Sequence, residues 1–352
     1  MTTCKKRMVI LGAGYVGIFL ATSIVRYVTE KIGEVILIDR NPYHQLLQEI
    51  HLVAADFRTV NEVQIPILKL IDRTSIKFIQ SAVKQIMPDN MVGLESIKIN
   101  YDLLIVCLGA SIKYFNIKGA RENTLSLHSI SDASLICDKM RALLKSNKKH
   151  DIIIVGGGAT GVSLGGALSD FVKGSKKSDM LTITIIEALP TILSGWDERL
   201  VEKVNEVLLK KEIRIRTISA VIRVENDSGT SCSNIYLSDS ESQIPSSLTV
   251  WTAGVKGYEI PISPEVEKTK DDRIILNEFC QVGSYPNIFC IGDIAAVKDE
   301  NGKLYPPLVQ IAVREAKYLS KIIPKHLSKI IPKHVIITDH ANLRSLPPNE
   351  KI

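Results

Sequence analysis

The stretch RMVILGAGYVGIFLATSIV, residues 7–25, decides the fold of this chain. Its apolar run Met8–Leu11 predicts a buried β-strand, and an apolar period typical of a helix begins shortly afterwards. Between them lie Gly12, Gly14 and Gly17, with the spacing GxGxxG. A strand, this glycine turn and a helix form the first half of a βαβ unit of the kind that binds a dinucleotide.

The second strand of this unit ends in an acid. Val35–Ile38 predict the buried strand, and Asp39 stands at its tip. In such units the three glycines permit, in order, the tight turn, the approach of a pyrophosphate and the close packing of the helix. The acid accepts hydrogen bonds from the ribose hydroxyls of the adenosine. The alternative is that Asp39 only begins the turn before Asn41 and Pro42, and we expect Arg40 to be exposed or to form a cap.

A second unit of the same kind follows. Ile152–Val155 predict its first strand, and Gly156, Gly158 and Gly161 repeat the spacing. The stretch LTITII then leads to Glu187. Two complete units imply two bound dinucleotides. Because Glu187 would repel a 2′-phosphate and no arginine follows it directly, we expect this second unit to bind NADH rather than NADPH.

Length and composition agree with a soluble protein of two domains. The 352 residues exceed the usual size of one core, and 45% apolar with 23% charged residues is ordinary. The net charge is +6, but only 5% of residues are aromatic and none interleave with basic clusters, so we expect no nucleic-acid partner. The six cysteines form no CxxC pair, which suits a reducing cytosol, and we expect no metal site. Glycines interrupt the apolar N-terminus, so we expect a cytoplasmic protein without a transmembrane helix.

Longer segments carry a family resemblance. YDLLIVCLGA (101–110), LTVWTAGV (248–255) and YPNIFCIGDIAA (285–296) accompany the two glycine motifs. Together they make the chain similar to the two-dinucleotide-binding flavoproteins of the pyridine nucleotide-disulfide oxidoreductase superfamily. Within it, VILIDRNPYHQLLQEIHLVAAD (35–56) and PPLVQIAVREAKYLS (306–320) most resemble the type II NADH:quinone oxidoreductases.

The resemblance covers about residues 6–322 and implies a fold class. This is α/β, with two Rossmann-like dinucleotide-binding domains of the glutathione-reductase type, the NADH domain being inserted into the FAD domain. The implied FAD-binding domain is discontinuous and comprises residues 1–117 and 258–322. The implied NADH-binding domain comprises residues 118–257.

We expect residues 323–352 to form an irregular C-terminal tail. LSKIIPKH at 319–326 is repeated identically at 327–334, and Pro324 and Pro332 would prevent one continuous helix. The C-terminal membrane segment that family members carry is not recognisable. The alternation of lysine with apolar residues would allow a weak peripheral contact with anionic lipid, and a poorly ordered terminus is the alternative.

The resemblance also implies site residues. Non-covalent FAD would be bound by Gly12, Gly14, Tyr15, Gly17, Asp39, Arg40, Val83, Gly109, Gly292, Asp293 and Val309. The substrate NADH would be bound by Gly156, Gly158, Thr160, Gly161, Glu187, Ala253 and Gly254. Gln310 and Arg314 would lie near the electron acceptor. Ser163 stands where the family often has a glutamate close to the contact between flavin and nicotinamide.

The implied activity is hydride transfer from NADH to FAD, followed by transfer of two electrons to a membrane quinone without proton pumping. The enzyme would attach peripherally to the inner face of the cell membrane, and a homodimer is compatible with this. One alternative is a soluble NADH-dependent flavoprotein reductase with another acceptor, which Ser163 and the missing anchor favour. A weaker alternative is a sulfide:quinone oxidoreductase, although Cys137, Cys232 and Cys280 lie in no motif that we recognise. Another is a nucleotide-binding chain without turnover. A disulfide reductase is disfavoured because residues 40–106 contain no cysteine.

Overall fold

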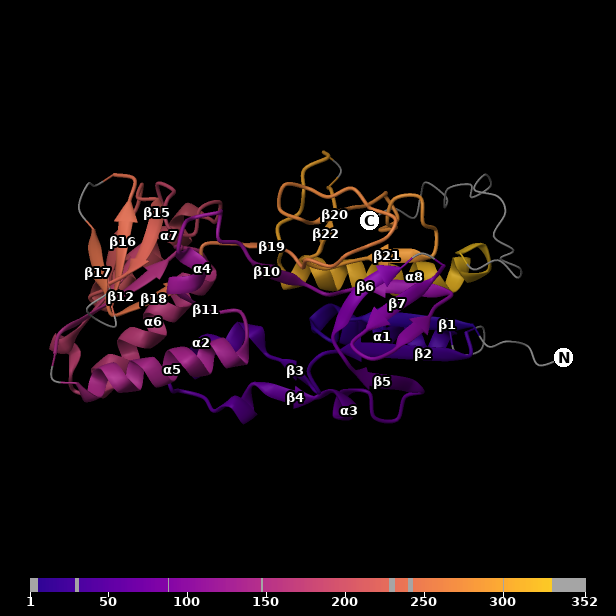
Figure 1. Ribbon diagram of the computed structural model, residues 1–352, viewed down its shortest axis with the longest axis horizontal. Coiled ribbons are helices and arrows are strands. Elements are labelled where there is room, and N and C mark those ends of the chain that lie inside the picture. Colours follow the sequence, from indigo (N-terminus) through magenta and orange to yellow (C-terminus); the bar gives the residue numbers. More distant parts are fainter. Residues whose placement is uncertain are drawn as a thin grey trace. The chain divides into compact units, whose positions relative to one another are not determined.

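The chain forms two compact units, whose elements are labelled in Figure 1. Unit 1 consists of Met1–His44, Ile65–Ser111 and Lys256–Ile352, and unit 2 consists of Gln45–Gln64 and Ile112–Val255. The computed structural model describes residues 6–28, 32–87, 89–146, 148–227, 232–239, 243–299 and 301–330.

Unit 1 is built on a five-stranded parallel sheet in the order β21-β9-β1-β2-β5. The strands are β1 (Arg7–Leu11), β2 (Glu34–Asp39), β5 (Ile76–Gln80), β9 (Leu103–Val106) and β21 (Ile288–Cys290). Leu11 pairs with both Ile38 and Val106, so the carboxyl ends of three neighbouring strands lie at one edge of the sheet. Ligands of open parallel sheets bind at this edge.

Two long helices of unit 1 pack against each other, α1 (Tyr15–Val28) and α8 (Val309–Ile330). The expected inner face of α1 is confirmed, since Ala21, Ile24 and Val25 are buried. Shorter elements complete the unit: β3 (Tyr43–Gln45), β4 (Gln64–Pro66), α3 (Ile67–Leu70), β6 (Val83–Met87), β7 (Met91–Leu94), β8 (Lys98–Asn100), β10 (Ala110–Ile112), β19 (Val255–Gly257), β20 (Ile274–Ile275) and β22 (Ala295–Ala296). The ribbons β3–β4 and β10–β19 lie where the chain passes from one unit into the other.

The C-terminal helix corrects one expectation. The sequence predicted that Pro324 would prevent a continuous helix and that an irregular tail would begin at residue 323, but α8 continues through Pro324 to Ile330. A proline removes one backbone hydrogen bond from a helix. Leu319, Ile322 and Ile323, directly before it, are fully or almost fully buried, and this packing holds the helix across the missing bond. Pro332 lies outside the described residues.

Unit 2 contains a second parallel sheet in the order β11-β18-β12-β13-β14. An antiparallel sheet, β15-β16-β17, packs on it through an apolar cluster that includes Trp251, Val224 and Ile235. The strands are β11 (Leu125–Ser126), β12 (His150–Val155), β13 (Leu181–Ile186), β14 (Arg214–Arg216), β15 (Val221–Asn226), β16 (Ser233–Leu237), β17 (Ile244–Ser246) and β18 (Leu248–Trp251). The helices are η1 (Leu47–Glu49), α2 (Ile50–Ala54), η2 (Val60–Glu62), α4 (Ala120–Asn123), α5 (Ile130–Lys145), α6 (Ala159–Gly174), η3 (Ser178–Met180) and α7 (Glu198–Lys210). The two sheets confirm the α/β class.

The grouping of residues 45–64 differs from the expected domain boundaries. The sequence placed this segment in the first domain, but it belongs to unit 2 because α2 packs on α5 and α6. Ile130 N–H donates to the Gln45 side-chain oxygen at 2.9 Å, and Arg141 Nε donates to Asp56 at 3.0 Å. The periodicity of a five-residue helix does not show which sheet it covers, so only the folded chain reveals this grouping.

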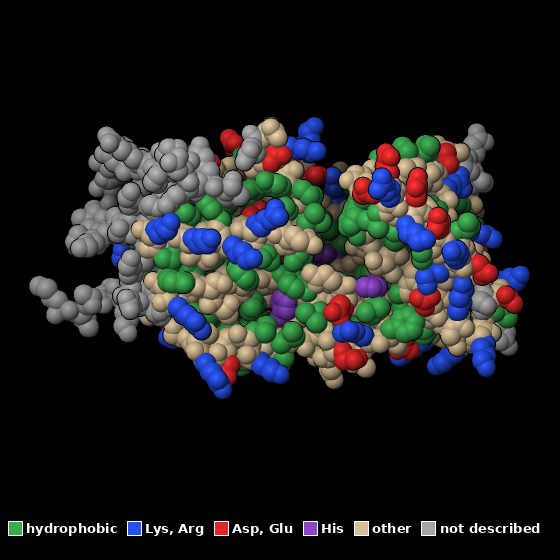
Figure 2. Space-filling model, turned by 180° about the vertical axis from the view of Figure 1, so that it is seen from behind, with side chains coloured by type: hydrophobic (Ala, Val, Ile, Leu, Met, Phe, Trp, Pro, Cys, Tyr) green, Lys and Arg blue, Asp and Glu red, His purple; other side chains and the backbone are tan. Residues whose placement is uncertain are grey.

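Among the described residues, no helix is long and apolar enough to cross a membrane. Figure 2 shows one face of the molecule, on which lysine and arginine side chains are spread among other residues, with acidic side chains between them. On this face the described basic side chains do not merge into one continuous patch.

Candidate functional site: two glycine turns, each closed by an acid

The first glycine turn of unit 1 joins β1 to α1. Gly12 has φ +98°, in the region that favours glycine, and its N–H donates to Ile38 O at 2.7 Å. A Cβ atom on Gly12 would lie 2.4 Å from Cys107 O, and one on Gly17 would lie 1.8 Å from Gly12 O. Both positions therefore require glycine, for the turn and for close packing of the helix, as the sequence predicted.

The middle glycine has the opposite surroundings. Gly14 is exposed, and a Cβ atom built there would meet nothing within 4 Å. It lies at the amino end of α1, where Ile18 N–H donates to Gly14 O at 3.1 Å. Open backbone at a helix N-terminus suits an anion, because the first N–H groups lack partners within the helix and the helix dipole is positive there. This geometry fits a pyrophosphate.

Asp39 closes the turn from the tip of β2. One carboxylate oxygen accepts the Ala13 N–H at 2.7 Å and the other accepts the Asn41 N–H at 2.8 Å. The expected turn before Asn41 is therefore present, together with a bond to the glycine loop. Each oxygen keeps a second lone pair, so the carboxylate can still accept from ligand hydroxyls.

The other residues predicted in unit 1 fall into two groups. Gly109 and Gly292 adopt positive φ values, +75° and +79°, just beyond the carboxyl ends of β9 and β21. With Asp293, these two glycines lie at the same edge of the sheet as Gly12 and Asp39. Tyr15 makes an edge-to-face contact with His44, with ring centroids 4.6 Å apart.

The second group comprises Arg40, Val83, Val309, Gln310 and Arg314. Arg40 is exposed, as expected, and its carbonyl accepts from Gln80. Val83 pairs with Leu94 in the antiparallel sheet β6-β7-β8. Val309 begins α8, and Gln310 and Arg314 are exposed on this helix.

One buried acid on α8, Glu315, was not predicted from the sequence. Glu315 is 3% exposed, and its carboxylate accepts the Gly292 N–H at 2.7 Å. Burial raises the pKa of Glu315 to about 7, although the Gly292 N–H and Arg273 act in the opposite direction. The signal was present, because Ala312, Glu315 and Leu319 are spaced for one face of a helix and all three are buried.

The second glycine turn repeats the geometry in unit 2. Gly156 has φ +107°, and its N–H donates to Ile186 O at 2.8 Å. A Cβ atom there would lie 2.6 Å from the Cα of Ala253, and one on Gly161 would lie 2.0 Å from Gly156 O. Gly158 at the start of α6 has nothing within 4 Å of a Cβ position. Beside it Thr160 is exposed, and the Gly254 carbonyl accepts from Lys113 N–H at 3.0 Å.

Glu187 closes this second turn. One carboxylate oxygen accepts the Gly157 N–H at 2.6 Å, and the other accepts the Leu189 N–H at 2.9 Å. A Cβ atom on Gly157 would lie 2.7 Å from Ile192 and 3.2 Å from Glu187. The glycine at this position therefore makes room for the longer acid.

Ser163 lies on α6, two residues after Gly161. It is exposed on α6 and lines a cavity of about 580 Å³. His51 of α2 also lines the cavity, and burial lowers its pKa, so His51 is neutral at pH 7. The remaining lining residues are Leu52, Phe57, Val162, Gly166, Ala167, Asp170, Lys203, Val204, Val207, Leu208 and Lys211. Gln310 and Arg314 belong to unit 1, and Ser163 belongs to unit 2.

Three of the described cysteines are core residues of unit 1. Cys107, Cys280 and Cys290 are buried and free, and burial raises the pKa of each thiol. Such thiols are protonated at neutral pH and react poorly as nucleophiles. Within the described part of the chain, no three His, Cys, Asp or Glu side chains gather in a way that could hold a metal ion.

Known proteins with similar sequences belong to a family of dinucleotide-binding enzymes, which agrees with the two glycine turns and their acids. The model of the pyridine nucleotide-disulphide oxidoreductase family matches residues 6–316. This chain belongs to that family. The type II NADH:quinone oxidoreductase of Staphylococcus saprophyticus is 26% identical over 336 residues, covering 91% of this chain and 82% of the relative. The enzyme of the same name from Staphylococcus aureus is 25% identical and covers 92% and 83%. The resemblance predicted from the sequence is confirmed.

Solved structures show the same fold. NDH2 from Plasmodium falciparum, determined in complex with NADH, has a TM-score of 0.80 at 20% identity, covering 91% of this chain and 83% of that chain. The sulfide:quinone oxidoreductase of Aquifex aeolicus has a TM-score of 0.78 at 20% identity, covering 92% and 78%. Because both identities are low, these structures support the fold of the family member described here and not its substrate.

Proposed function

We propose that this family member is an FAD-dependent NADH dehydrogenase that passes two electrons to a quinone. The observation that carries the proposal is the pair of glycine turns, each with an open middle glycine and an acid bonded to the loop. Curated relatives named type II NADH:quinone oxidoreductases support the choice of donor and acceptor.

In this proposal unit 1 holds FAD without a covalent bond. The residues fit the group, because Gly14 leaves the amino end of α1 open and Asp39 has lone pairs left for ribose hydroxyls. Gly109, Gly292 and Asp293, at the same sheet edge, would contact the rest of the molecule. Tyr15, Arg40, Val83 and Val309 are further candidate contacts.

Unit 2 would bind NADH in the same way. Gly158 and Thr160 would face the pyrophosphate, and Glu187 would accept from the ribose 2′-hydroxyl and repel a 2′-phosphate. Ala253 and Gly254 would line the nicotinamide end. Bound FAD would accept the hydride and later reduce the quinone, and the chain would supply binding, orientation and electrostatics.

Three residues are proposed near the chemistry. Gln310 and Arg314 are exposed on the first turns of α8 and would contact the acceptor. The amino end of this helix would favour negative charge on the group that it faces. Ser163 carries no charge, so it would not replace the glutamate that the family often has.

The membrane part of the proposal rests on α8. Lys317, Lys321 and Lys325 are exposed and four residues apart, so they share one face of the helix. These three lysines would attract anionic lipid at the inner face of the cell membrane. The protein could bind there as a monomer or as a homodimer. Flotation with anionic vesicles at low and high salt tests it: binding lost at high salt supports the contact, and no binding at low salt contradicts it.

The main experiment is an anaerobic visible spectrum of the purified protein, with NADH added first and a water-soluble quinone second. Bleaching of a flavin band by NADH, followed by its rapid return with quinone, is the expected result. Bleaching without return would favour the second candidate, a soluble reductase with another acceptor, which Ser163 favours. A sulfide:quinone oxidoreductase is disfavoured because its chemistry uses reactive cysteines, whereas burial keeps Cys107, Cys280 and Cys290 protonated.

A further inference from the structure

The backbone of Glu187 is held by a single turn, residues 216–219. Glu187 N–H donates to Arg216 O at 2.8 Å, and Ser219 N–H donates to Glu187 O at 3.0 Å. Ile218 N–H donates to Leu189 O at 3.1 Å, two residues further on. The acid that would bind the ribose is therefore held on both sides by one short segment, which begins at the last residue of β14.

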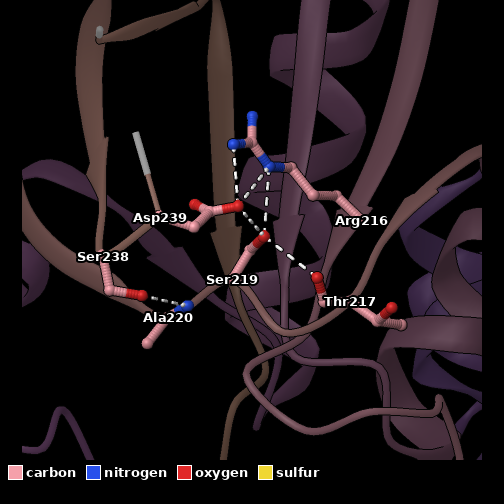
Figure 3. Close-up of polar contacts among 6 residues, drawn as sticks. All are labelled: Arg216, Thr217, Ser219, Ala220, Ser238 and Asp239. Carbon is pink, nitrogen blue, oxygen red and sulfur yellow. Dashed lines mark hydrogen bonds and ion pairs between the residues drawn. The ribbon is translucent and has the colours of Figure 1, made fainter. Parts of the chain in front are cut away.

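Side chains lock this turn, as Figure 3 shows. Arg216 Nη2 donates to Asp239 Oδ2 at 2.9 Å, and Arg216 Nε donates to Ser219 Oγ at 3.1 Å. Ser219 is 1% exposed, and its hydroxyl donates to Asp239 Oδ2 at 2.7 Å. The Ser219 hydroxyl and Arg216 lower the pKa of Asp239, so its charge persists over the physiological range.

Arg216 is also a neighbour of Glu187 in the parallel sheet. It pairs with Ile186 in the sheet, one residue before Glu187, although it is far from Glu187 in the sequence. Sites that accept a 2′-phosphate use an arginine near the ribose. Here the guanidinium is already bonded to Asp239 and Ser219, and Asp239 balances its charge.

We infer that Asp239 is a positioning residue that holds Glu187 through the 216–219 turn and keeps Arg216 occupied, so that unit 2 selects dinucleotides with a free 2′-hydroxyl. This inference rests on the proposed NADH site and deepens it, because it names what enforces the choice between NADH and NADPH. The recognised group is the ribose edge of the adenosine.

The test compares the oxidised dinucleotides NAD⁺ and NADP⁺, which bind without reducing the flavin. Their dissociation constants are measured by calorimetry on the flavin-loaded protein. In Asp239→Asn, which keeps the size and removes the charge, we expect the preference for NAD⁺ to fall roughly three- to tenfold. Ser219→Ala, which removes the shared hydroxyl, should lower it in the same direction and serves if the first variant does not fold.

Two further variants distinguish the mechanism from a general loss of structure. Glu225→Gln removes the acid of the Arg223 ion pair in the same unit and should leave the preference unchanged. Adding Arg216→Gln to Asp239→Asn should remove any gain in NADP⁺ affinity, because the released cation is then absent.

The outcomes separate this inference from the proposed function. An unchanged preference in both Asp239→Asn and Ser219→Ala, with NAD⁺ still bound, would overturn the inference and leave the NADH site standing. If the unmodified protein bound neither dinucleotide, the proposed function would fail and the inference with it.

Discussion

The two glycine turns of this chain perform one task with acids of different length. In unit 1 the short Asp39 reaches the N–H of Ala13, and in unit 2 the longer Glu187 reaches the N–H of Gly157. Alanine is accommodated in the first turn, whereas a Cβ atom at 157 would collide with Ile192 and crowd Glu187. The extra methylene of the acid is thus offset by the loss of a methyl group in the loop.

The helices behind the turns differ more. In unit 1, α1 packs on α8, which brings the buried Glu315 to the Gly292 amide. In unit 2, α6 packs on α2 and lines a cavity that contains Ser163 and His51. The two motifs are alike, but their helices pack on different partners, with a buried acid beside the first and a cavity beside the second.

The largest effects should come from the packing glycines. Gly17→Ala and Gly161→Ala place a methyl group 1.8 and 2.0 Å from a carbonyl oxygen, and each should lower the free energy of unfolding by about 3 kcal/mol or more. Gly17→Ala should lose bound flavin, whereas Gly161→Ala should keep flavin and lose NAD⁺ affinity. Flavin absorbance and calorimetry measure this, and the reverse pattern would contradict the assignment of the two units.

Glu315 should make stability depend on pH. The native carboxyl keeps its proton up to about pH 7, whereas the unfolded chain ionises near 4.5, so the free energy of unfolding should fall between these values as pH rises. Glu315→Gln keeps an acceptor for Gly292 and lacks the titration. We expect the variant to match the unmodified protein at pH 4 and to exceed it by up to about 3 kcal/mol at pH 8.

Urea denaturation at both pH values tests this prediction. If the free energy of unfolding changed equally with pH in both proteins, Glu315 would not titrate between these two pH values. Glu259→Gln in the same unit changes an exposed acid bonded to Lys256 and is the matched control for the loss of one carboxylate.

The two acids should have separable effects on ligands. Asp39→Ala should weaken FAD retention by about 1.5–3 kcal/mol, since charge-assisted hydrogen bonds are lost, and leave the ratio of NADH to NADPH rates unchanged. Glu187→Ala should narrow that ratio and leave FAD in place. Flavin release on dilution and steady-state rates with each nucleotide measure these changes. Asp39→Asn, which keeps acceptor oxygen, should show a smaller loss.

The smallest effects should come from substitutions at Gly157 and Ala13, the loop residues whose N–H groups bond to the two acids. Gly157→Ala should cost about 1–3 kcal/mol of unfolding free energy because the methyl group meets Ile192. Ala13→Gly should cost about 0.5–1 kcal/mol, through added freedom of the unfolded chain. Thermal or urea unfolding of both variants compares them. Equal costs would show that the length of the acid does not decide the residue in the loop.

Much of the site was predictable because it is local. The strands before Gly12 and Gly156, the glycines themselves and the acids at the strand tips follow from the period of apolar residues and from the space that backbone turns allow. Glu315 was also within reach, since helical spacing places it on the buried face of α8. The sequence could not predict the hydrogen-bond partner of Glu315, the Gly292 amide, because the two residues are distant in the sequence.

The sequence by itself determined the family, the α/β class and the two glycine turns, because each of these depends on residues that are neighbours along the chain. The tertiary structure decided that residues 45–64 belong to unit 2, that α8 continues through Pro324, and that Asp239 holds the turn beside Glu187. These depend on packing between distant segments, where burial of side chains outweighs local propensity and no short pattern records the partner.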